Sequence, residues 1–271
     1  MDKSVLLIGC GNMGYAMLQG WLESGLPATQ IHVVEPDEAL RNRAGSLGVH
    51  ATGAAADLPA ALAPAIVVVA VKPQVIGDVL PAYRRFADAG STILSIAAGT
   101  LVSTFEQIFG ADTAVIRCMP NTPAAIGKGM MVCFANGRVS NEVRAFSHDL
   151  LASSGKVAFV DDEALMDAVT GVSGSGPAYV FHFIECLTEA GIAAGLPAEL
   201  AAELALQTVC GSALLAASSE DGPAELRAKV TSPNGTTAAA LDVLMGGNRL
   251  QELLKEAVMA ATRRSRELAN S

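Results

Sequence analysis

Seven short apolar runs between residues 4 and 160 restrict the fold of this chain more than any other feature of its sequence. The runs are Val5–Ile8, Ile31–Val34, Ile66–Val71, Thr92–Ile96, Ala114–Cys118, Met130–Phe134 and Lys156–Phe159. Several are apolar throughout, as in strands that are covered on both faces, and helical stretches separate the early ones. This alternation predicts an α/β fold with a doubly wound, mostly parallel sheet.

The pattern changes after Asp161, where the strand signals stop. Apolar residues between 180 and 194 recur at helical spacing. Further helices are predicted over about 198–217, 236–244 and 249–268. We therefore divide the chain into a sheet domain, residues 1–161, and an all-helical domain, residues 162–271.

Composition and charge narrow the classes of partner. Hydrophobic residues make up 51% of the chain and charged residues 17%, so a large core can form and wholesale disorder is excluded. The formal net charge of -9 disfavours nucleic acids and anionic lipid as partners. The longest wholly apolar run, residues 65–71, is far shorter than the roughly 20 residues that span a bilayer. We expect no membrane span and, because a strand starts near Lys3, no signal peptide.

The cysteines and histidines predict a reducing compartment and no metal. The chain has five cysteines, an odd number, and none of them form a C-x-x-C pair. That pattern favours free thiols in the cytoplasm over a disulfide framework or a zinc site. No two of the four histidines have a metal-binding spacing.

A glycine-rich segment follows the first predicted strand. Residues 9–14 read G-x-G-x-x-G and open a predicted helix over residues 15–23. Gly9 permits a tight turn, Gly11 lets the backbone approach a pyrophosphate, and Gly14 lets the helix lie close to the strand. The pyrophosphate then meets free N–H groups at the helix N-terminus. The segment predicts a Rossmann-like domain that binds a nicotinamide dinucleotide.

The second predicted strand is followed by residues that bear on the choice of cofactor. Glu35 lies where an acidic residue binds the adenosine ribose, and its charge favours NADH over NADPH. Arg41 and Arg43 could offset that charge, although a solvated helix face explains them equally well. The sequence leaves the choice between NADH and NADPH open.

Two later strand ends also carry candidate site residues. Lys72 and Pro73 follow the third apolar run, at the sheet edge where ligands dock in open α/β sheets. Met119–Pro123 follows the fifth run, and the Asn121 amide offers contacts to a ribose or nicotinamide. Taken alone, either segment could equally be a rigid surface turn.

A polar loop over residues 230–237 precedes a helix in the second half. Ser232 and Thr236 resemble helix-capping residues, and Gly235 frees the backbone. A nest of N–H and hydroxyl groups of this kind suits a substrate carboxylate. An ordinary helix cap is the alternative.

Five segments together resemble the pyrroline-5-carboxylate reductase family. They are Ile8–Gly14, Ala70–Gln74, Arg117–Pro123, Gly171–Tyr179 and Leu226–Leu241. The resemblance implies an NADPH- or NADH-dependent oxidoreductase that reduces 1-pyrroline-5-carboxylate to L-proline, the last step of proline biosynthesis. It also implies that the helical half is a dimerisation domain, and that the homodimers assemble into a homodecamer in the cytoplasm.

The same resemblance completes the set of site residues. The predicted cofactor contacts are Gly9, Gly11, Asn12, Met13, Gly14, Glu35, Pro36, Asp57, Ala70, Val71, Lys72, Pro73, Ala97, Ala98, Met119, Pro120 and Asn121. The predicted substrate contacts are Ser232, Gly235, Thr236 and Thr237, with Thr237 as the catalytic group that hydrogen-bonds the ring nitrogen. The family often has Gly-Gly where this chain has Asn234–Gly235, and we expect the loop to keep its shape because asparagine tolerates left-handed backbone angles.

Three other functions remain in view. A hydroxyacid dehydrogenase of the same plan needs a lysine or histidine base, and residues 172–185 offer only His182. An imine reductase for another substrate would share the fold but not need a carboxylate-binding loop. A non-catalytic nucleotide sensor would have the dinucleotide site without that loop.

Overall fold

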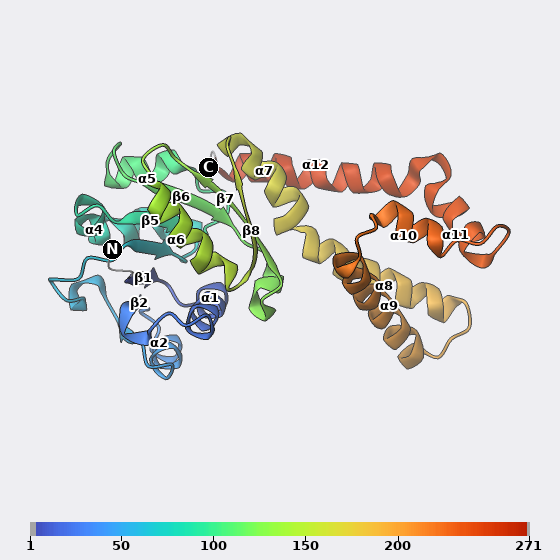
Figure 1. Cartoon of the computed structure of the whole chain (residues 1–271), viewed down its shortest axis with the longest axis horizontal. Coiled ribbons are helices and arrows are strands. Elements are labelled where there is room, and N and C mark those ends of the chain that lie inside the picture. Colours follow the sequence, from blue (N-terminus) through green and yellow to red (C-terminus); the bar gives the residue numbers. More distant parts are fainter. Residues whose placement is uncertain (1–3, 270–271) are drawn as a thin grey trace. The chain divides into compact units, whose positions relative to one another are not determined.

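The computed structural model describes residues 4–269 of the chain. These residues form two compact units (Figure 1). Unit 1 comprises residues up to Ser175 together with those from Ala260 onward, and unit 2 comprises Gly176–Met259. The last helix, α12 (Arg249–Ala269), therefore contributes to both units.

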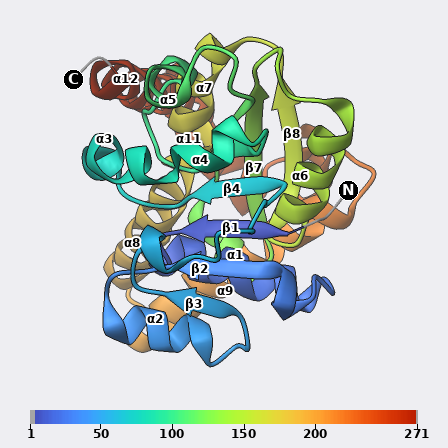
Figure 2. The same ribbon diagram turned by 90° about the vertical axis from the view of Figure 1, so that its left-hand side faces the viewer.

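Unit 1 is built on an eight-stranded sheet in the order β3-β2-β1-β4-β5-β6-β7-β8. The strands are β1 Val5–Ile8, β2 Ile31–Val34, β3 His50–Thr52, β4 Ile66–Val69, β5 Thr92–Ser95, β6 Val115–Met119, β7 Gly129–Ala135 and β8 Gly155–Val160. Figure 2 shows β4, β1, β2 and β3 following one another across the sheet. All neighbouring strands that the structure describes run parallel except the β6–β7 pair. The predicted mostly parallel, doubly wound sheet is confirmed.

Helices cover both faces of this sheet. One face carries α1 Asn12–Glu23, α2 Glu38–Gly45 and α6 Asn141–Ala152, and the other carries α3 Ile76–Val79, α4 Arg84–Asp88 and α5 Val102–Phe109. Short 3-10 turns join them: η1 Ala28–Gln30, η2 Ala55–Asp57, η3 Pro73–Val75, η4 Leu80–Tyr83 and η5 Thr122–Ile126. Along β1, Val5 and Leu7 belong to one hydrophobic cluster and Leu6 and Ile8 to the other. Burial on both faces is why this strand is apolar throughout.

The segment after β8 also belongs to unit 1. It comprises η6 (Glu163–Leu165), α7 (Met166–Val169) and a π-helical turn over Thr170–Gly174. Met166 is fully buried there, and the last turns of α12 join the same unit. The first division between the compact units along the chain thus falls after Ser175, whereas the sequence analysis placed it between residues 161 and 162.

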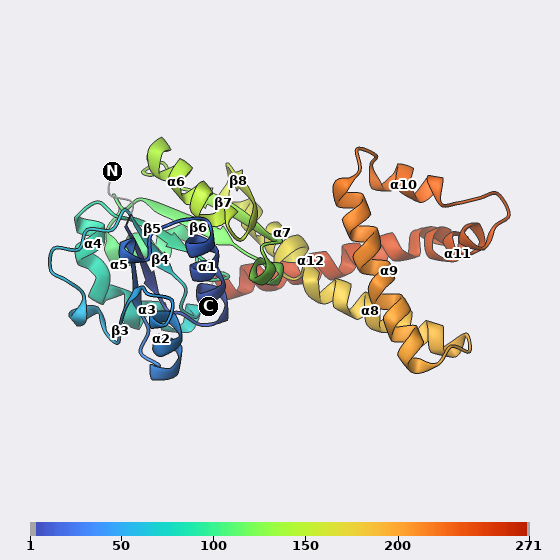
Figure 3. The same cartoon turned by 60° about the horizontal axis from the view of Figure 1, so that its bottom comes forward.

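Unit 2 is all-helical, as predicted. Its helices are α8 Gly176–Ala193, α9 Ala198–Ser218, α10 Pro223–Lys229 and α11 Thr236–Met245, followed by η8 Gly246–Asn248 and the first part of α12. Helices α8 and α9 pack side by side (Figure 3), with Gly191 close against Ala201. Helix α10 was not predicted.

Unit 2 leaves most of its apolar side chains uncovered. Among its residues only Ala201 and Ala205 are buried. Large side chains such as Phe181, Leu206 and Leu214 are more than half exposed. By length and composition, α9 is the one helix within residues 4–269 that could cross a membrane, and little of it is buried. Exposed apolar area of this extent marks an interaction surface.

A pair of histidines predicts how stability depends on pH. His32 of β2 stacks on His50 of β3 with ring centroids 4.8 Å apart. Burial, and then the nearby charge of His50, lower the pKa of His32 below 6.5. The folded state therefore binds fewer protons at His32 than the unfolded state, and stability is lost as the pH falls below about 6.5. We expect the urea midpoint of the wild type to fall more between about pH 7 and about pH 5 than that of His32→Gln. Equal falls in chemical denaturation would contradict this account.

Candidate active site

The glycine-rich turn lies where three neighbouring strands of the sheet, β2, β1 and β4, end. Gly9 has a φ of 87°, and its N–H donates to the Val34 carbonyl at 2.9 Å. On the other side, the Ala70 N–H donates to the Ile8 carbonyl at 2.8 Å. The turn therefore sits at the carboxyl ends of β2, β1 and β4, the place where open α/β sheets bind dinucleotides.

The other two glycines of the turn have different surroundings. A Cβ atom on Gly14 would lie 2.6 Å from the Gly9 carbonyl oxygen, so α1 can approach β1 only with glycine there. A Cβ atom on Gly11 would meet no atom within 4 Å. Gly11 is the N-cap of α1, no side chain caps this end, and the first turn has no acidic residue. The helix N-terminus thus offers uncommitted N–H groups beside open space, which fits a pyrophosphate.

Glu35 has a role that the sequence did not reveal. Its side chain is buried, with 7% of the residue exposed. One carboxylate oxygen accepts a hydrogen bond from the Cys10 N–H at 2.7 Å, and the other accepts from the Asp37 N–H at 3.0 Å. The carboxylate therefore fixes the shape of the glycine-rich turn, and the ribose contact predicted for it would compete with these two bonds.

Arg41 and Arg43 lie against the same turn. Arg41 donates to the carbonyls of Glu35 and Pro36 at 2.9 and 2.8 Å. Arg43 donates to the Cys10 carbonyl at 3.0 Å. The interpretation of these arginines as a solvated helix face is therefore wrong for Arg43.

The Arg43 guanidinium is held from two directions and keeps unused donors. It stacks on the Tyr15 ring with 4.0 Å between the guanidinium carbon and the ring centroid. Its Nε atom is buried and has no hydrogen-bond partner. Burial of a donor without an acceptor costs free energy, and the stack on Tyr15 and the bond to Cys10 offset that cost at Arg43.

Asp57 lies on a nearby 3-10 turn and is exposed. Its carboxylate accepts from the Ala54 N–H at 3.1 Å, which closes the turn. Gly53 stands beside it, where a Cβ atom would lie 3.5 Å from Nη1 of Arg41. A positive and a negative group therefore flank this side of the site.

A cavity of about 320 Å³ lies at the ends of β4, β5 and β6. Its lining comprises Met13, Ala70, Val71, Lys72, Pro73, Ile96, Ala97, Ala98, Met119, Pro120, Asn121, Thr122 and Gly174. The predicted site residues at these three strand ends therefore come together around one space. Sequence reasoning missed Gly174, although it belongs to the glycine-rich segment 171–179.

Asn121 uses its side-chain amide inside the protein. Its Nδ2 atom donates to the backbone carbonyl and to the hydroxyl of Ser173, at 3.3 Å in both cases. Its Oδ1 atom accepts from the Met130 N–H at 2.9 Å. The amide thus links the loop after β6 to the π-helical turn, and it is not free for the predicted contact to a ribose or nicotinamide.

The predicted substrate loop lies in unit 2. Asn234 has a φ of 61°, so it adopts the left-handed conformation that we expected it to tolerate. Gly235 is the N-cap of α11, and no side chain caps that end. The prediction that Ser232 and Thr236 cap this helix is therefore wrong: Thr236 is the first helical residue. The first N–H groups of α11 are left for an anionic group, and Thr237 beside them is half-buried.

Two family models match the chain. Residues 4–99 match the model described as NADP oxidoreductase, coenzyme F420-dependent. Residues 163–268 match the model for pyrroline-5-carboxylate reductase dimerisation.

Curated relatives cover almost the whole chain. The chain is 42% identical to a pyrroline-5-carboxylate reductase of Pseudomonas aeruginosa over 267 residues, which covers 98% of this chain and 96% of that protein. It is 38% identical to the enzyme of the same name from Pisum sativum over 263 residues, which covers 97% and 94% of the two chains.

Solved structures agree with these relatives. A pyrroline-5-carboxylate reductase from Coxiella burnetii superposes with a TM-score of 0.94 at 33% identity and covers 100% of both chains. The pyrroline carboxylate reductase of Plasmodium falciparum, solved with NADP bound, superposes with a TM-score of 0.83 at 29% identity and covers 98% of both chains.

The two glycines of the turn give a paired test. Gly11→Ala places a methyl group in open space, so we expect only the small loss of thermal stability that a poorer N-cap brings, but a loss of NADPH affinity of about tenfold or more. Gly14→Ala forces the helix away from the Gly9 carbonyl, so we expect it to lower the melting temperature as well. Calorimetric melting and NADPH titration of the two variants measure both effects. Full NADPH affinity in Gly11→Ala would be inconsistent with a pyrophosphate at this helix start.

Proposed function

We propose how the two reactants are bound, starting from the premise that the chain belongs to the pyrroline-5-carboxylate reductase family. It reduces 1-pyrroline-5-carboxylate to L-proline with NADPH or NADH as the reductant. The observation that carries the site assignment is the cavity at the carboxyl edge of the sheet, beside an uncapped helix start.

The residues of unit 1 would hold the cofactor in two places. The free N–H groups at the start of α1 bind the pyrophosphate, with Gly11 allowing the close approach. The apolar cavity lined by Ala70, Ala97 and Met119 takes the nicotinamide end. The bound cofactor supplies a hydride to the C=N carbon of the substrate.

We assign NADPH as the preferred reductant. The Glu35 carboxylate is held by two backbone N–H donors and is turned toward the glycine-rich turn. Arg41 and Arg43 both belong to α2, and both donate to backbone carbonyls around the end of β2 and the glycine-rich turn. Two guanidinium groups at the end of β2 favour a 2′-phosphate over a free hydroxyl.

The start of α11 would hold the substrate. Its uncapped N–H groups attract the carboxylate of the cyclic imine through hydrogen bonds and the helix dipole. The Thr237 hydroxyl hydrogen-bonds the ring nitrogen and keeps its proton in place. Ser232, Gly235 and Thr236 complete this loop. Catalysis then rests on orientation and charge placement by these groups.

The other functions have less support. His182 is the histidine nearest to the start of α8, but its ring is exposed and pairs with Glu185 at 3.0 Å on the same helix. A base for alcohol oxidation has to lie in a pocket facing the nicotinamide. The acidic chain and the reducing pattern of its cysteines favour a cytoplasmic enzyme without nucleic-acid or membrane partners.

The chain forms a homo-oligomer, which the match to the dimerisation model supports. We assign residues 162–271 as the dimerisation and substrate domain. The exposed apolar side chains of unit 2, α9 included, are the surface that a second copy covers. Five such dimers would make the homodecamer that the family resemblance implies.

Removing the Thr237 hydroxyl tests the substrate site. We expect Thr237→Ala to lower kcat/KM for 1-pyrroline-5-carboxylate by about ten- to a hundredfold, because a polar contact in a dry site is lost. Thr237→Ser keeps the hydroxyl and should recover most of the activity. If Thr237→Ala reduced the substrate as fast as the wild type, the role given to this residue would be wrong.

Removing the two arginines tests the cofactor preference. We expect the wild type to oxidise NADPH at lower concentrations than NADH in the presence of 1-pyrroline-5-carboxylate. Arg41→Ala with Arg43→Ala should raise KM for NADPH about tenfold more than KM for NADH, since both cofactors use the turn that these arginines contact but only NADPH carries the 2′-phosphate. Arg84→Ala, an exposed arginine paired with Asp88 on α4, is the matched control. Equal effects on the two cofactors would remove the proposed 2′-phosphate site.

A further inference from the structure

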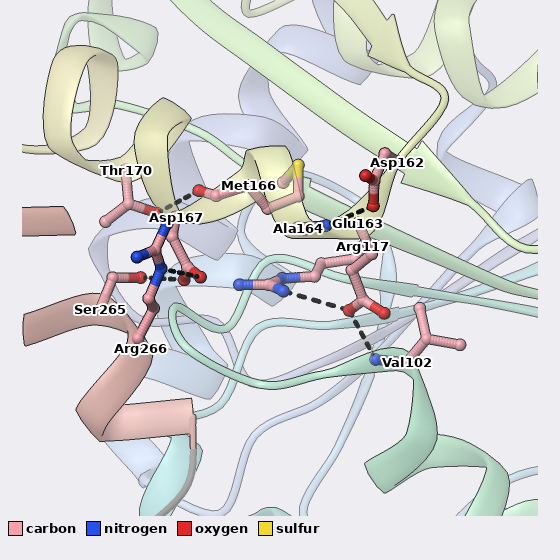
Figure 4. Close-up of polar contacts among 10 residues, drawn as sticks. All are labelled: Val102, Arg117, Asp162, Glu163, Ala164, Met166, Asp167, Thr170, Ser265 and Arg266. Carbon is pink, nitrogen blue, oxygen red and sulfur yellow. Dashed lines mark hydrogen bonds and ion pairs between the residues drawn. The ribbon is translucent and has the colours of Figure 1, made fainter. Parts of the chain in front are cut away.

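One lining residue of the cavity, Gly174, ends the segment 163–174, to which no predicted site residue belongs. Two carboxylates four positions apart, Glu163 and Asp167, hold this segment in place (Figure 4). Each carboxylate contacts a different part of unit 1. Together they determine where the end of the segment, Gly174, meets the cavity.

Glu163 connects the segment to the sheet. Its Oε1 atom accepts from Nη1 of Arg117 at 3.1 Å and from the Val102 N–H at 2.9 Å. Arg117 lies on β6 and is only 3% exposed. The carboxylate therefore joins β6 and the start of α5 to the beginning of the segment. The bond to β6 is made at Arg117, two residues before Met119, which lines the cavity.

Asp167 connects the segment to the last turns of α12. Its Oδ1 atom accepts from the Ser265 hydroxyl at 2.7 Å, and Ser265 is 4% exposed. Its Oδ2 atom lies 3.5 Å from Nε of Arg266, whose side chain is 60% exposed. The short bond to the buried hydroxyl is the stronger contact, because solvent weakens an exposed ion pair.

A continuous helical run leads from Asp167 to the cavity. The Thr170 hydroxyl donates to the Met166 carbonyl at 2.9 Å, and the π-helical turn follows. The turn ends at Gly174, where a Cβ atom would lie 2.4 Å from Cε of Met119. The Asn121 bonds to Ser173 and the contact of Gly174 with the Met119 side chain join the turn to the end of β6 and the loop after it. A shift of α7 would therefore move the wall of the cavity.

The end of α12 also contacts the loop after β5, which carries two lining residues of the cavity. A Cβ atom on Gly99 would lie 3.4 Å from Cβ of Leu268. Gly99 follows Ala97 and Ala98, which both line the cavity. The last turns of α12 thus contact α7 through Ser265 and the loop after β5 through Leu268.

We propose that Asp167 is a positioning residue for the nicotinamide end of the cofactor. Its bond to Ser265 fixes α7 against the end of α12, and so holds Gly174 and the Ala97–Gly99 loop at the spacing that the nicotinamide ring needs. Asp167 touches neither reactant. The proposal rests on the assignment of this cavity to the nicotinamide made under the proposed function.

Two ligands separate positioning from general stability. NADPH occupies both the glycine-rich turn and the cavity, whereas adenosine diphosphate carries the adenine half and the pyrophosphate without a nicotinamide. A change confined to the cavity wall therefore weakens NADPH binding and leaves the binding of adenosine diphosphate unchanged. A general loss of structure weakens both.

The experiment uses the full-length enzyme and calorimetric titration with each ligand. We expect Asp167→Ala and Ser265→Ala to raise the Kd for NADPH about tenfold, to lower kcat/KM in parallel, and to leave the Kd for adenosine diphosphate within about twofold. Asp167→Asn keeps the acceptor for Ser265 and should bind NADPH like the wild type. Arg264→Ala removes a solvent-facing partner of Glu267 on the same turn of α12 and serves as the matched control.

The possible outcomes are distinct. Wild-type NADPH affinity in both alanine variants would overturn the proposal, as would equal losses for the two ligands or a similar loss in Arg264→Ala. If Asp167→Ala does not fold, the NADPH and adenosine diphosphate affinities of Ser265→Ala decide the question. Ala98→Trp fills the cavity from its exposed rim and checks the assignment itself. Unchanged NADPH affinity in Ala98→Trp would contradict the assignment of the cavity to the nicotinamide. Weaker NADPH binding in Ala98→Trp, with wild-type affinity in the Asp167 and Ser265 variants, would overturn only the positioning role.

Discussion

The approach of α1 to β1 at the glycine-rich turn is the contact on which the rest of unit 1 depends. Gly14 lies so close to the Gly9 carbonyl that no side chain fits between them, and this closeness aims the start of α1 at the edge of the sheet. Glu35 holds the turn in that shape through the Cys10 N–H, from a strand that pairs with β1. The geometry that binds a pyrophosphate is thus produced by packing and one buried carboxylate, before any ligand is present.

The sheet could be predicted from the sequence because burial on both faces leaves a mark on every central strand. All seven predicted runs are strands, most with ends shifted by one or two residues. Strand β3 escaped notice because it has three residues, one of them exposed, and lies at the edge of the sheet. Helix α10 is similarly short, with no buried residue to create a periodic pattern.

The site could be predicted only where topology alone brings residues together. The carboxyl ends of parallel strands lie at the same edge of the sheet, so Ala70, Ala97 and Met119 come together because of the strand order and not because of their side-chain contacts. The bonds of Glu163 to Arg117 and of Asp167 to Ser265 join positions 46 and 98 residues apart, respectively. No local sequence pattern predicts contacts between residues so far apart in the chain. The role of Glu35 could not be predicted for a related reason: its charge is visible in the sequence, but the backbone N–H groups that bond its carboxylate are not.

The near absence of buried residues in unit 2 has a consequence for how this enzyme can exist. Two buried alanines offset little of the conformational entropy of ordering α8 to α11 and the first part of α12, so the homo-oligomer interface proposed for this half would supply much of its stability. Folding of this half and association of the chains would then be linked by mass action. Under that linkage, dilution would act on this protein as a denaturant does, and its melting temperature would rise with the concentration of chains.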